Sequence, residues 1–256
     1  MKFIILGCGY SMGVPRADSF FGECDPNEKK NYRTRCSAFI STDKENVLID
    51  TSPDLRHQLI RHKIKRIDKV FYSHMHGDQT HGINDLRIFY VKNKKPIDIY
   101  ADKATSKYLR ESFSYCFKST HKEYPAILKF NNIRKKLFIN SLNKKIQVKT
   151  IKVDHGKVNS ICYIIDKKLA YISDVSKIYK KDYKNFKNLK YLIIDCLWYR
   201  KHPSHFNLDT SLKMIEIFSP KKAILTNLHT DLDYKILKKK LPKNTIPAYD
   251  GLTLKL

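Results

Sequence analysis

The sequence lacks the features that carry a chain to or through a membrane, and it lacks paired cysteines. No apolar run approaches the length of a membrane span, and the first one, Phe3–Leu6, ends at Gly7 and is far too short for a signal peptide. The six cysteines are scattered without a Cys-x-x-Cys pair, so we expect free thiols. These absences predict a cytoplasmic protein with no membrane partner.

Acidic residues are scarce, with 25 Asp and Glu against 50 Lys and Arg, which gives a formal net charge of +25. Such an excess favours a polyanionic partner. The lysines are nevertheless spread along the whole chain, and its richness in isoleucine and asparagine suggests that compositional bias of the source genome contributes. A small anionic substrate is at least as compatible with this charge as a nucleic acid.

The chain also lacks internal repeats and linkers rich in proline, glycine or serine, so we predict one domain, residues 1–256. Short apolar runs alternate with polar breaks, and many strands with interspersed helices predict the α/β class. Strands are expected at 3–6, 38–41, 47–49, 70–72, 97–100, 146–153, 161–164, 170–172, 192–194, 223–225 and 252–256. Helices are expected at 55–62, 104–117 and 208–218, the last capped by Asn207 or Ser204.

One stretch, residues 72–82, is rich in histidine and reads Tyr-Ser-His-Met-His-Gly-Asp-Gln-Thr-His-Gly. It follows a short β-branched and aromatic run, so it lies where a strand passes into a loop. Side chains two residues apart in extended backbone point the same way, so His74, His76 and Asp78 can converge on one point. Imidazole and carboxylate ligands suit a divalent transition metal such as zinc or manganese. The alternative is a polar loop that happens to be rich in histidine.

Several other predicted strands also end in a metal-binding or acidic residue. Strand ends collected at one rim are where α/β folds place their chemistry, although aspartate is also common in turns. The residues concerned are Asp50, His74, Asp154 with His155, Asp174, Asp195 and His229.

The histidine-rich stretch resembles the His-x-His-x-Asp-His motif of the metallo-β-lactamase fold hydrolases. The following Gly-Ile-Asn-Asp-Leu-Arg, residues 82–87, makes it similar to the branch of phosphoribosyl cyclic phosphodiesterases, which is related to the tRNA 3′-end nucleases. The resemblance extends over nearly the whole chain. It implies an αβ/βα sandwich of four layers, with the site along the edge where two sheets meet. Relatives also suggest a homodimer.

Carried over residue by residue, the resemblance assigns the first of two divalent metals, zinc or manganese, to His74, His76 and His155. Asp78 would hold the second metal and Asp174 would bridge the two. A bridging carboxylate holds two cations close together. Asp50 matches an acid that accepts a proton from a ligand histidine. A plain turn aspartate remains an alternative for Asp174, and a helix-leading acid remains one for Asp50.

Two departures from the family pattern fall on the same metal. The family usually has histidine where this chain has Gln79 and Asn227. The second site could be empty, or it could be rebuilt with an imidazole from His229 or His81. The two amide residues could also bind through their carbonyl oxygens, which would favour a harder ion such as manganese or magnesium. We favour rebuilding by His229, and His81 could instead orient the loop.

His205, in a loop with two histidines, matches a residue that contacts the phosphate and protonates the leaving oxygen, and histidine titrates in a suitable range. A loop-stabilising histidine is the alternative. Arg33 and Arg35 could grip phosphate oxygens, and we retain Arg35 as a substrate contact. Cys24 stands alone in its loop, so we predict no structural zinc.

Together these features predict a metal-dependent phosphodiesterase that hydrolyses a small phosphodiester, such as a cyclic ribose phosphate or nucleotide, by attack of a metal-bound hydroxide. Asp78 and His205 are the predicted catalytic residues. An RNA 3′-processing nuclease of the same fold is one alternative, as is a thioester or lactam hydrolase. A metal- or nucleotide-binding module with little turnover is the alternative from a different class.

Overall fold

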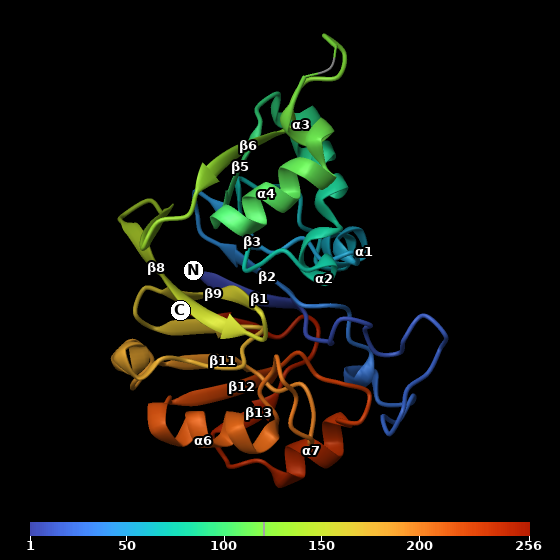
Figure 1. Cartoon of the computed structure of the whole chain (residues 1–256), viewed down its shortest axis with the longest axis vertical. Coiled ribbons are helices and arrows are strands. Elements are labelled where there is room, and N and C mark those ends of the chain that lie inside the picture. The colour runs from blue at the N-terminus through green and yellow to red at the C-terminus, as the bar shows by residue number, and fades with distance from the viewer. Residues whose placement is uncertain (120) are drawn as a thin grey trace.

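The computed structural model describes residues 1–119 and 121–256, and it places two seven-stranded sheets face to face with helices on both outer sides (Figure 1). The α/β class and the four-layer sandwich are therefore confirmed. The first sheet contains, in spatial order, β14 (Thr253–Lys255), β1 (Lys2–Gly7), β2 (Ser37–Ser41), β3 (Asn46–Ile49), β4 (Lys69–Phe71), β5 (Ile97–Ala101) and β6 (Leu128–Asn132). The second contains β13 (Thr245–Pro247), β12 (Lys222–Thr226), β11 (Tyr191–Asp195), β10 (Leu169–Ile172), β9 (Val158–Ile165), β8 (Lys145–His155) and β7 (Lys136–Asn140).

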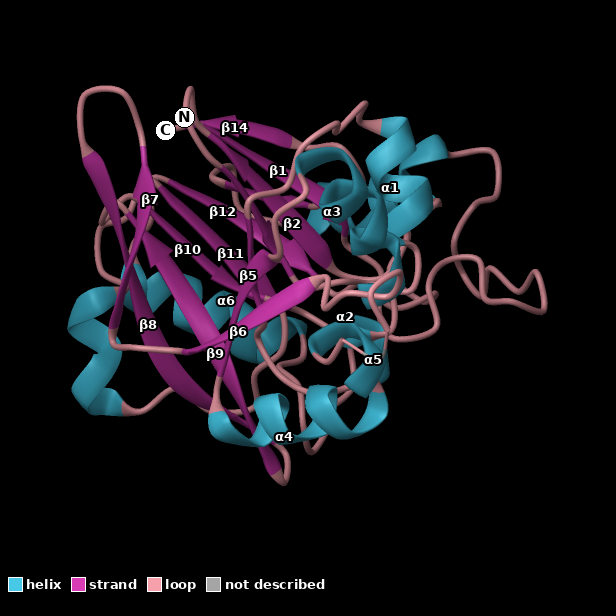
Figure 2. Ribbon diagram, turned by 90° about the horizontal axis from the view of Figure 1, so that it is seen from above, coloured by secondary structure: helices cyan, strands magenta, loops and turns pink. Residues whose placement is uncertain are grey.

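Helices cover the two outer faces (Figures 1 and 2). Over the first sheet and the loops after it lie α1 (Leu55–Arg61), α2 (Gly77–Thr80), α3 (Arg87–Asn93), α4 (Lys103–Ser112) and α5 (Ser114–Phe117), and the C-terminal half supplies α6 (Leu208–Phe218) and α7 (Tyr234–Lys240). Three short 3-10 helices complete the set: Lys29–Asn31, Ile83–Leu86 and Lys180–Asn185.

Alternate side chains of a strand point to opposite faces of its sheet and so pack into different apolar layers. In β9, Ile161, Tyr163 and Ile165 pack into the apolar layer between the two sheets, while Cys162 and Ile164 face the α6 side. The same alternation divides β3, where Val47 and Ile49 face the other sheet and Leu48 faces the helices. Side chains in a strand point to opposite faces in turn, so each of these strands contributes to two cores.

The predicted elements are largely present, with differences where sequence signals were weak. The α6 helix has the predicted bounds, and the side chain of Asn207 rather than Ser204 caps it, accepting a bond from the Thr210 N–H at 3.2 Å. The predicted helix 104–117 is two helices, because Phe113 leaves helical geometry at φ −128°. Strands β6, β7 and β13 and helices α2, α3 and α7 were not predicted.

Each sheet contains a set of parallel strands whose ends lie near the histidine-rich loop and the acids. β3, β4, β5 and β6 run parallel in the first sheet, and β10 to β13 run parallel in the second.

The two sheets are also joined by hydrogen bonds beside the end of β4. The Tyr163 hydroxyl donates to the Tyr72 carbonyl at 2.6 Å, and the Ile161 N–H donates to the Ser73 carbonyl at 2.9 Å. The histidine-rich loop is therefore fastened to both sheets.

Replacing Tyr163 by phenylalanine tests this fastening. The ring and its stacking on Phe71 are kept, but the Tyr72 carbonyl loses its buried donor, so we expect a loss of about 1–2 kcal/mol in unfolding free energy. Urea unfolding measures it. Tyr183→Phe is the matched control, because that hydroxyl reaches only the Met214 sulfur at 3.8 Å and its loss should change little. Equal stabilities of the two variants would contradict the prediction.

Candidate metal centre

The histidine-rich loop leaves β4 at Phe71 and enters α2 at Gly77. His76 is extended, at φ −63° and ψ 153°, so the predicted alternation holds for His74 and His76. Asp78 lies in the first turn of α2 instead. The Asp78 side chain still lines a cavity together with His76 and His155, but the turn of a helix, rather than extended backbone, directs it there.

Three imidazoles from the two sheets meet at one point. The His76 Nδ1 atom lies 3.0 Å from His74 Nε2 and 3.2 Å from His155 Nε2, and His155 comes from the end of β8 in the opposite sheet. Ring centroids of the three are 4.6 to 4.9 Å apart. These are ligand-type nitrogens within 4.8 Å of one another, an arrangement that suits a tetrahedral divalent ion.

The hydrogen bonds of these rings decide which nitrogens face inward. The His155 Nδ1–H donates to the Ser204 carbonyl at 2.6 Å, which leaves Nε2 with its lone pair. Burial lowers the pKa of His74 to about 3 and also lowers the pKa of His76, so both rings are neutral near pH 7. Three converging nitrogens on neutral rings can offer their lone pairs to a cation, so the residues present fit a metal.

The approach of Ser204 to His155 depends on a glycine. Gly156 has φ +59°, and a Cβ at this position would lie 2.8 Å from the Ser204 Cβ. Only glycine takes this conformation and this close approach without strain. The strand that carries His155 and the loop that carries His205 therefore lie in direct contact.

Opposite the three histidines lies a buried acidic cluster at the ends of β10 and β11. His205 Nδ1–H donates to Asp195 Oδ2 at 2.8 Å, and Asp174 Oδ1 lies 4.0 Å from the same nitrogen. Burial lowers the pKa of His205, but the charge of Asp195 and its hydrogen bond outweigh it, so the pKa rises to about 9. His205 therefore carries a proton at neutral pH, and its Nε2 is left to serve a substrate.

Asp195 completes this dyad, and sequence reasoning noted it only as one strand-end acid among several. Both of its oxygens are used: Oδ2 also accepts from the Val175 N–H at 2.9 Å, and Oδ1 accepts from Asn227 Nδ2 at 3.1 Å. The available signal was its place at the end of a fully apolar strand run, ten residues before His205.

The second missed residue is Ser73. We predicted that Asp50 would contact a ligand histidine, but its Oδ1 accepts from the Ser73 N–H at 2.6 Å, and the Ser73 hydroxyl lies 3.0 Å from His74 Nδ1. Asp50 thus supports His74 through Ser73. Burial raises the pKa of Asp50 well above its ordinary value. Its left-handed backbone, φ +62°, is one that aspartate tolerates.

The two amide residues lie against the carboxylates. Gln79 Nε2 is 3.1 Å from Asp78 Oδ2 and 3.4 Å from Asp174 Oδ2, and Asn227 Nδ2 is 3.5 Å from Asp174 Oδ1. Burial, then the neighbouring Asp174, raises the pKa of Asp78 to about 6.

Two predicted site histidines, His81 and His229, are held by other side chains. His81 Nε2 bonds to the Tyr108 hydroxyl at 2.8 Å, away from the cavity. His229 lines the cavity, but its ring lies between Tyr10 and Trp198 and its Nδ1 is 3.2 Å from Asp231. Within residues 1–119 and 121–256, the groups of potential ligands that converge are His74 with His76 and His155, and His155 with Asp174 and His205, and His229 is in neither. The favoured rebuilding by His229 therefore has no support in this geometry.

The arginines are also held away from the cavity. Arg35 makes a two-pronged ion pair with Asp54, at 2.8 and 2.7 Å, and Arg33 is buried and donates to the Leu232 carbonyl at 2.7 Å. Each arginine therefore has a structural partner within the protein, so its presence does not require a substrate. Neither arginine lines the cavity that contains the histidines.

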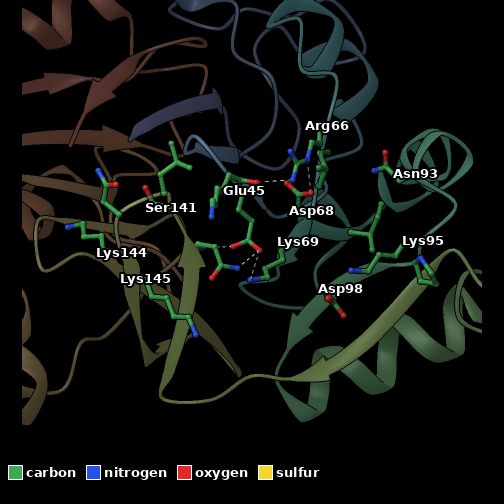
Figure 3. A pocket seen from close by; sticks show the side chains of 17 residues that line it. Glu45, Arg66, Asp68, Lys69, Asn93, Lys95, Asp98, Ser141, Lys144 and Lys145 are labelled. Atoms are coloured by element: carbon green, nitrogen blue, oxygen red, sulfur yellow. Dashed lines mark hydrogen bonds and ion pairs between the residues drawn. The ribbon is translucent and has the colours of Figure 1, made fainter.

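The cavity itself is about 300 Å³, and its lining is of two kinds. Histidines and acids line it together with apolar and aromatic side chains, namely Tyr10, Met12, Leu197 and Trp198. A hollow of about 730 Å³ elsewhere, lined by six Lys or Arg side chains and the Glu45–Lys69 ion pair of 2.8 Å, lies at the opposite ends of β3 to β5 (Figure 3). It contains none of the predicted site residues.

Comparison with known proteins agrees with this geometry. A solved structure described as a new diphosphatase from the PhnP family superposes with a TM-score of 0.87 at 28% identity, covering 100% of this chain and 97% of that one. An octanoyltransferase of Porphyromonas gingivalis is 28% identical over 256 residues, 98% of this chain and 51% of that protein. A ribonuclease Z of Staphylococcus epidermidis is 35% identical over 83 residues, 30% of this chain and 26% of that protein.

Two facing sheets with histidines and acids at their shared edge define the metallo-β-lactamase fold. Residues 45–227 match the Beta-lactamase superfamily domain, and the chain belongs to that family. It spans about half the length of the P. gingivalis relative. Among the described residues, no helix has the length and hydrophobicity needed to span a bilayer.

The Arg35–Asp54 pair yields a stability prediction. Burial raises the pKa of Asp54, but the hydrogen bonds from Arg35 lower it by a larger amount. The pKa of Asp54 therefore lies below its ordinary value. The pair therefore stabilises the fold above about pH 4, and this contribution is lost as the pH falls through the folded-state pKa. Asp54→Asn should cost about 1 kcal/mol at pH 7, and its difference from the parent should shrink below pH ~4.

Urea unfolding between pH 3 and 7 measures this difference. Asp18→Asn is the control, since the Arg16–Asp18 pair is more exposed, with 59% of the Asp18 side chain accessible, and should contribute little. A gap between Asp54→Asn and the parent that stays constant across this range would refute the pairing.

Proposed function

We propose that this hydrolase cleaves a small anionic phosphodiester, such as a cyclic ribose phosphate or a nucleotide, with a divalent ion, zinc or manganese, on His74, His76 and His155. The observation that carries the proposal is the three-imidazole cluster with His205 beside it, bonded to Asp195 at 2.8 Å in the same small cavity. A bound divalent ion would neutralise charge on phosphoryl oxygens and make water more acidic.

The chain's own residues supply the rest of the chemistry. Asp195 holds the proton of His205 on Nδ1 and keeps the ring oriented, so Nε2–H can protonate an alkoxide leaving group. A protonated imidazole also attracts the phosphate charge. Esters and amides of carbon acids need less cationic stabilisation of their oxygens than a phosphodiester anion does, which favours phosphorus over carbon as the centre attacked.

Cavity size and wall chemistry support a small substrate with an organic part. A volume of about 300 Å³ is at the low end for ligand pockets and holds roughly one nucleotide-sized molecule. The aromatic and aliphatic side chains of the lining would contact a ribose or base, while the polar side chains would contact the phosphate.

An RNA 3′-processing nuclease is the second candidate, favoured by the net charge of +25 and by the ribonuclease Z relative. Such an enzyme would need to admit the end of an RNA chain to the same cavity. Cleavage of a precursor tRNA at a rate exceeding that of cyclic phosphates would favour this candidate over the first.

The test is turnover of bis(p-nitrophenyl) phosphate by metal-stripped protein re-supplied with zinc or manganese. We expect metal-dependent release of nitrophenol, lost by on the order of 100-fold or more in His155→Ala. His57→Ala, an exposed histidine on α1, is the control and should match the parent. Turnover without added metal, or an unaffected His155→Ala enzyme, would refute the proposal.

The role of His205 has its own signature. Nitrophenolate leaves readily without a proton, whereas the alkoxide of a cyclic ribose phosphate does not. His205→Ala should therefore lose about 100-fold or more in kcat on the cyclic phosphate and much less on the nitrophenyl ester. Equal losses on both substrates would assign His205 to phosphate binding alone.

A further inference from the structure

The position that a second metal would need is occupied by hydrogen-bond donors. Asp78 and Asp174 are the acids that the family resemblance assigns to a second ion, and each faces the Gln79 amide nitrogen, at 3.1 and 3.4 Å. The Asn227 amide nitrogen approaches the other oxygen of Asp174, at 3.5 Å, and Asp195 at 3.1 Å. An amide N–H has no lone pair to give to a metal, so these contacts satisfy the carboxylates without one.

Turning the amides over would not create a ligand set in this arrangement. It would place the Gln79 carbonyl oxygen 3.1 and 3.4 Å from carboxylate oxygens, which repel it. The Asn227 carbonyl oxygen would lie 3.1 and 3.5 Å from two more carboxylate oxygens, against one favourable contact with the His205 Nδ1–H at 3.1 Å. Gln79 is fully buried in α2, where the Thr51 N–H binds its carbonyl at 2.8 Å, and its Oε1 atom is buried without a partner among the described residues. The orientation that leaves Oε1 unpaired is thus the one that satisfies both acids.

Among the described residues, neither His81 nor His229 replaces the two imidazoles that the sequence lacks, because His81 is bonded to Tyr108 and His229 is held by Asp231 within an aromatic stack. His205 does lie beside Asp174, but its Nδ1–H is given to Asp195 at 2.8 Å. Asn227 is also fixed by its backbone, which has φ +63° at the end of β12, a conformation that asparagine accepts readily.

We infer that this chain binds one divalent metal, on His74, His76 and His155, and that Gln79 and Asn227 take the place of a second. The two amides act as positioning residues: they hold Asp78, Asp174 and Asp195 by N–H bonds where relatives would use a cation. The inference rests on the proposed function for its first metal, but it can fail separately, because metal is counted directly rather than through activity.

The experiment counts metal on the full chain. Protein stripped with chelator is incubated with excess Zn²⁺ or Mn²⁺, passed through a desalting column and analysed by mass spectrometry for metal per chain. We expect one equivalent of either ion. Two tightly held equivalents would overturn the inference and leave the proposed function standing, whereas no bound metal would overturn both.

Two variants test the part played by the amides. Gln79→His with Asn227→His restores imidazoles at both places, and a second equivalent should then bind on the order of 100-fold more tightly than to the parent. A double variant that retains its circular dichroism spectrum and still holds one equivalent would overturn the role given to the amides.

Gln79→Glu is the more conservative variant, because it keeps the size of the side chain and exchanges the donor for a third carboxylate. Repulsion among the three acids should make its melting temperature rise with added Mn²⁺ by more than that of the parent. An equal rise in both proteins would overturn the role given to the Gln79 amide. Gln58→Glu, buried on α1 outside the metal centre, is the matched control for introducing a buried carboxylate.

Discussion

The apolar layer between the two sheets is the constraint on which this site depends. His74 and His76 leave the first sheet, and His155 ends a strand of the second, so no single element can form the cluster. Packing of residues such as Phe71 and Tyr163 sets how far apart the sheets stand, and the two hydrogen bonds at Tyr72 and Ser73 fix where the histidine loop crosses the seam. The catalytic geometry is therefore a consequence of the core.

The buried carboxylates of this site are stabilised mainly by neutral hydrogen-bond donors rather than by Lys or Arg side chains. Asp50, Asp174 and Asp195 are almost completely buried, and burying an ionised carboxylate is costly unless it is paired. Asp195 accepts bonds from His205, the Val175 N–H and the Asn227 amide. Asp174 faces two amides and approaches His205. Asp50 accepts from the Ser73 N–H, and burial raises its pKa. The strongly positive surface of the chain plays no direct part in these contacts.

The sequence was informative where a residue's position follows from local rules. The strand-end pattern placed Asp50, His74 and Asp174 near one another, because β3, β4 and β10 each pair with a parallel neighbour. His155 joins them from the end of the antiparallel strand β8, and the cap and periodicity of α6 gave its bounds. It was weak where position depends on tertiary contact. The bonds that withdraw His81, His229 and Arg35 come from Tyr108, Asp231 and Asp54, and Ser73 enters the site only because of where the two sheets meet.

The contact between Gly156 and Ser204 joins two parts of the chemistry into one mechanical unit. The carbonyl of Ser204 sets the rotation of the His155 ring, and the next residue along the loop is His205. A displacement of this loop would therefore move the His155 ring and the His205 ring together. Loop diversification, a common route by which proteins of one fold acquire new ligands, is therefore restricted at this point of the cavity.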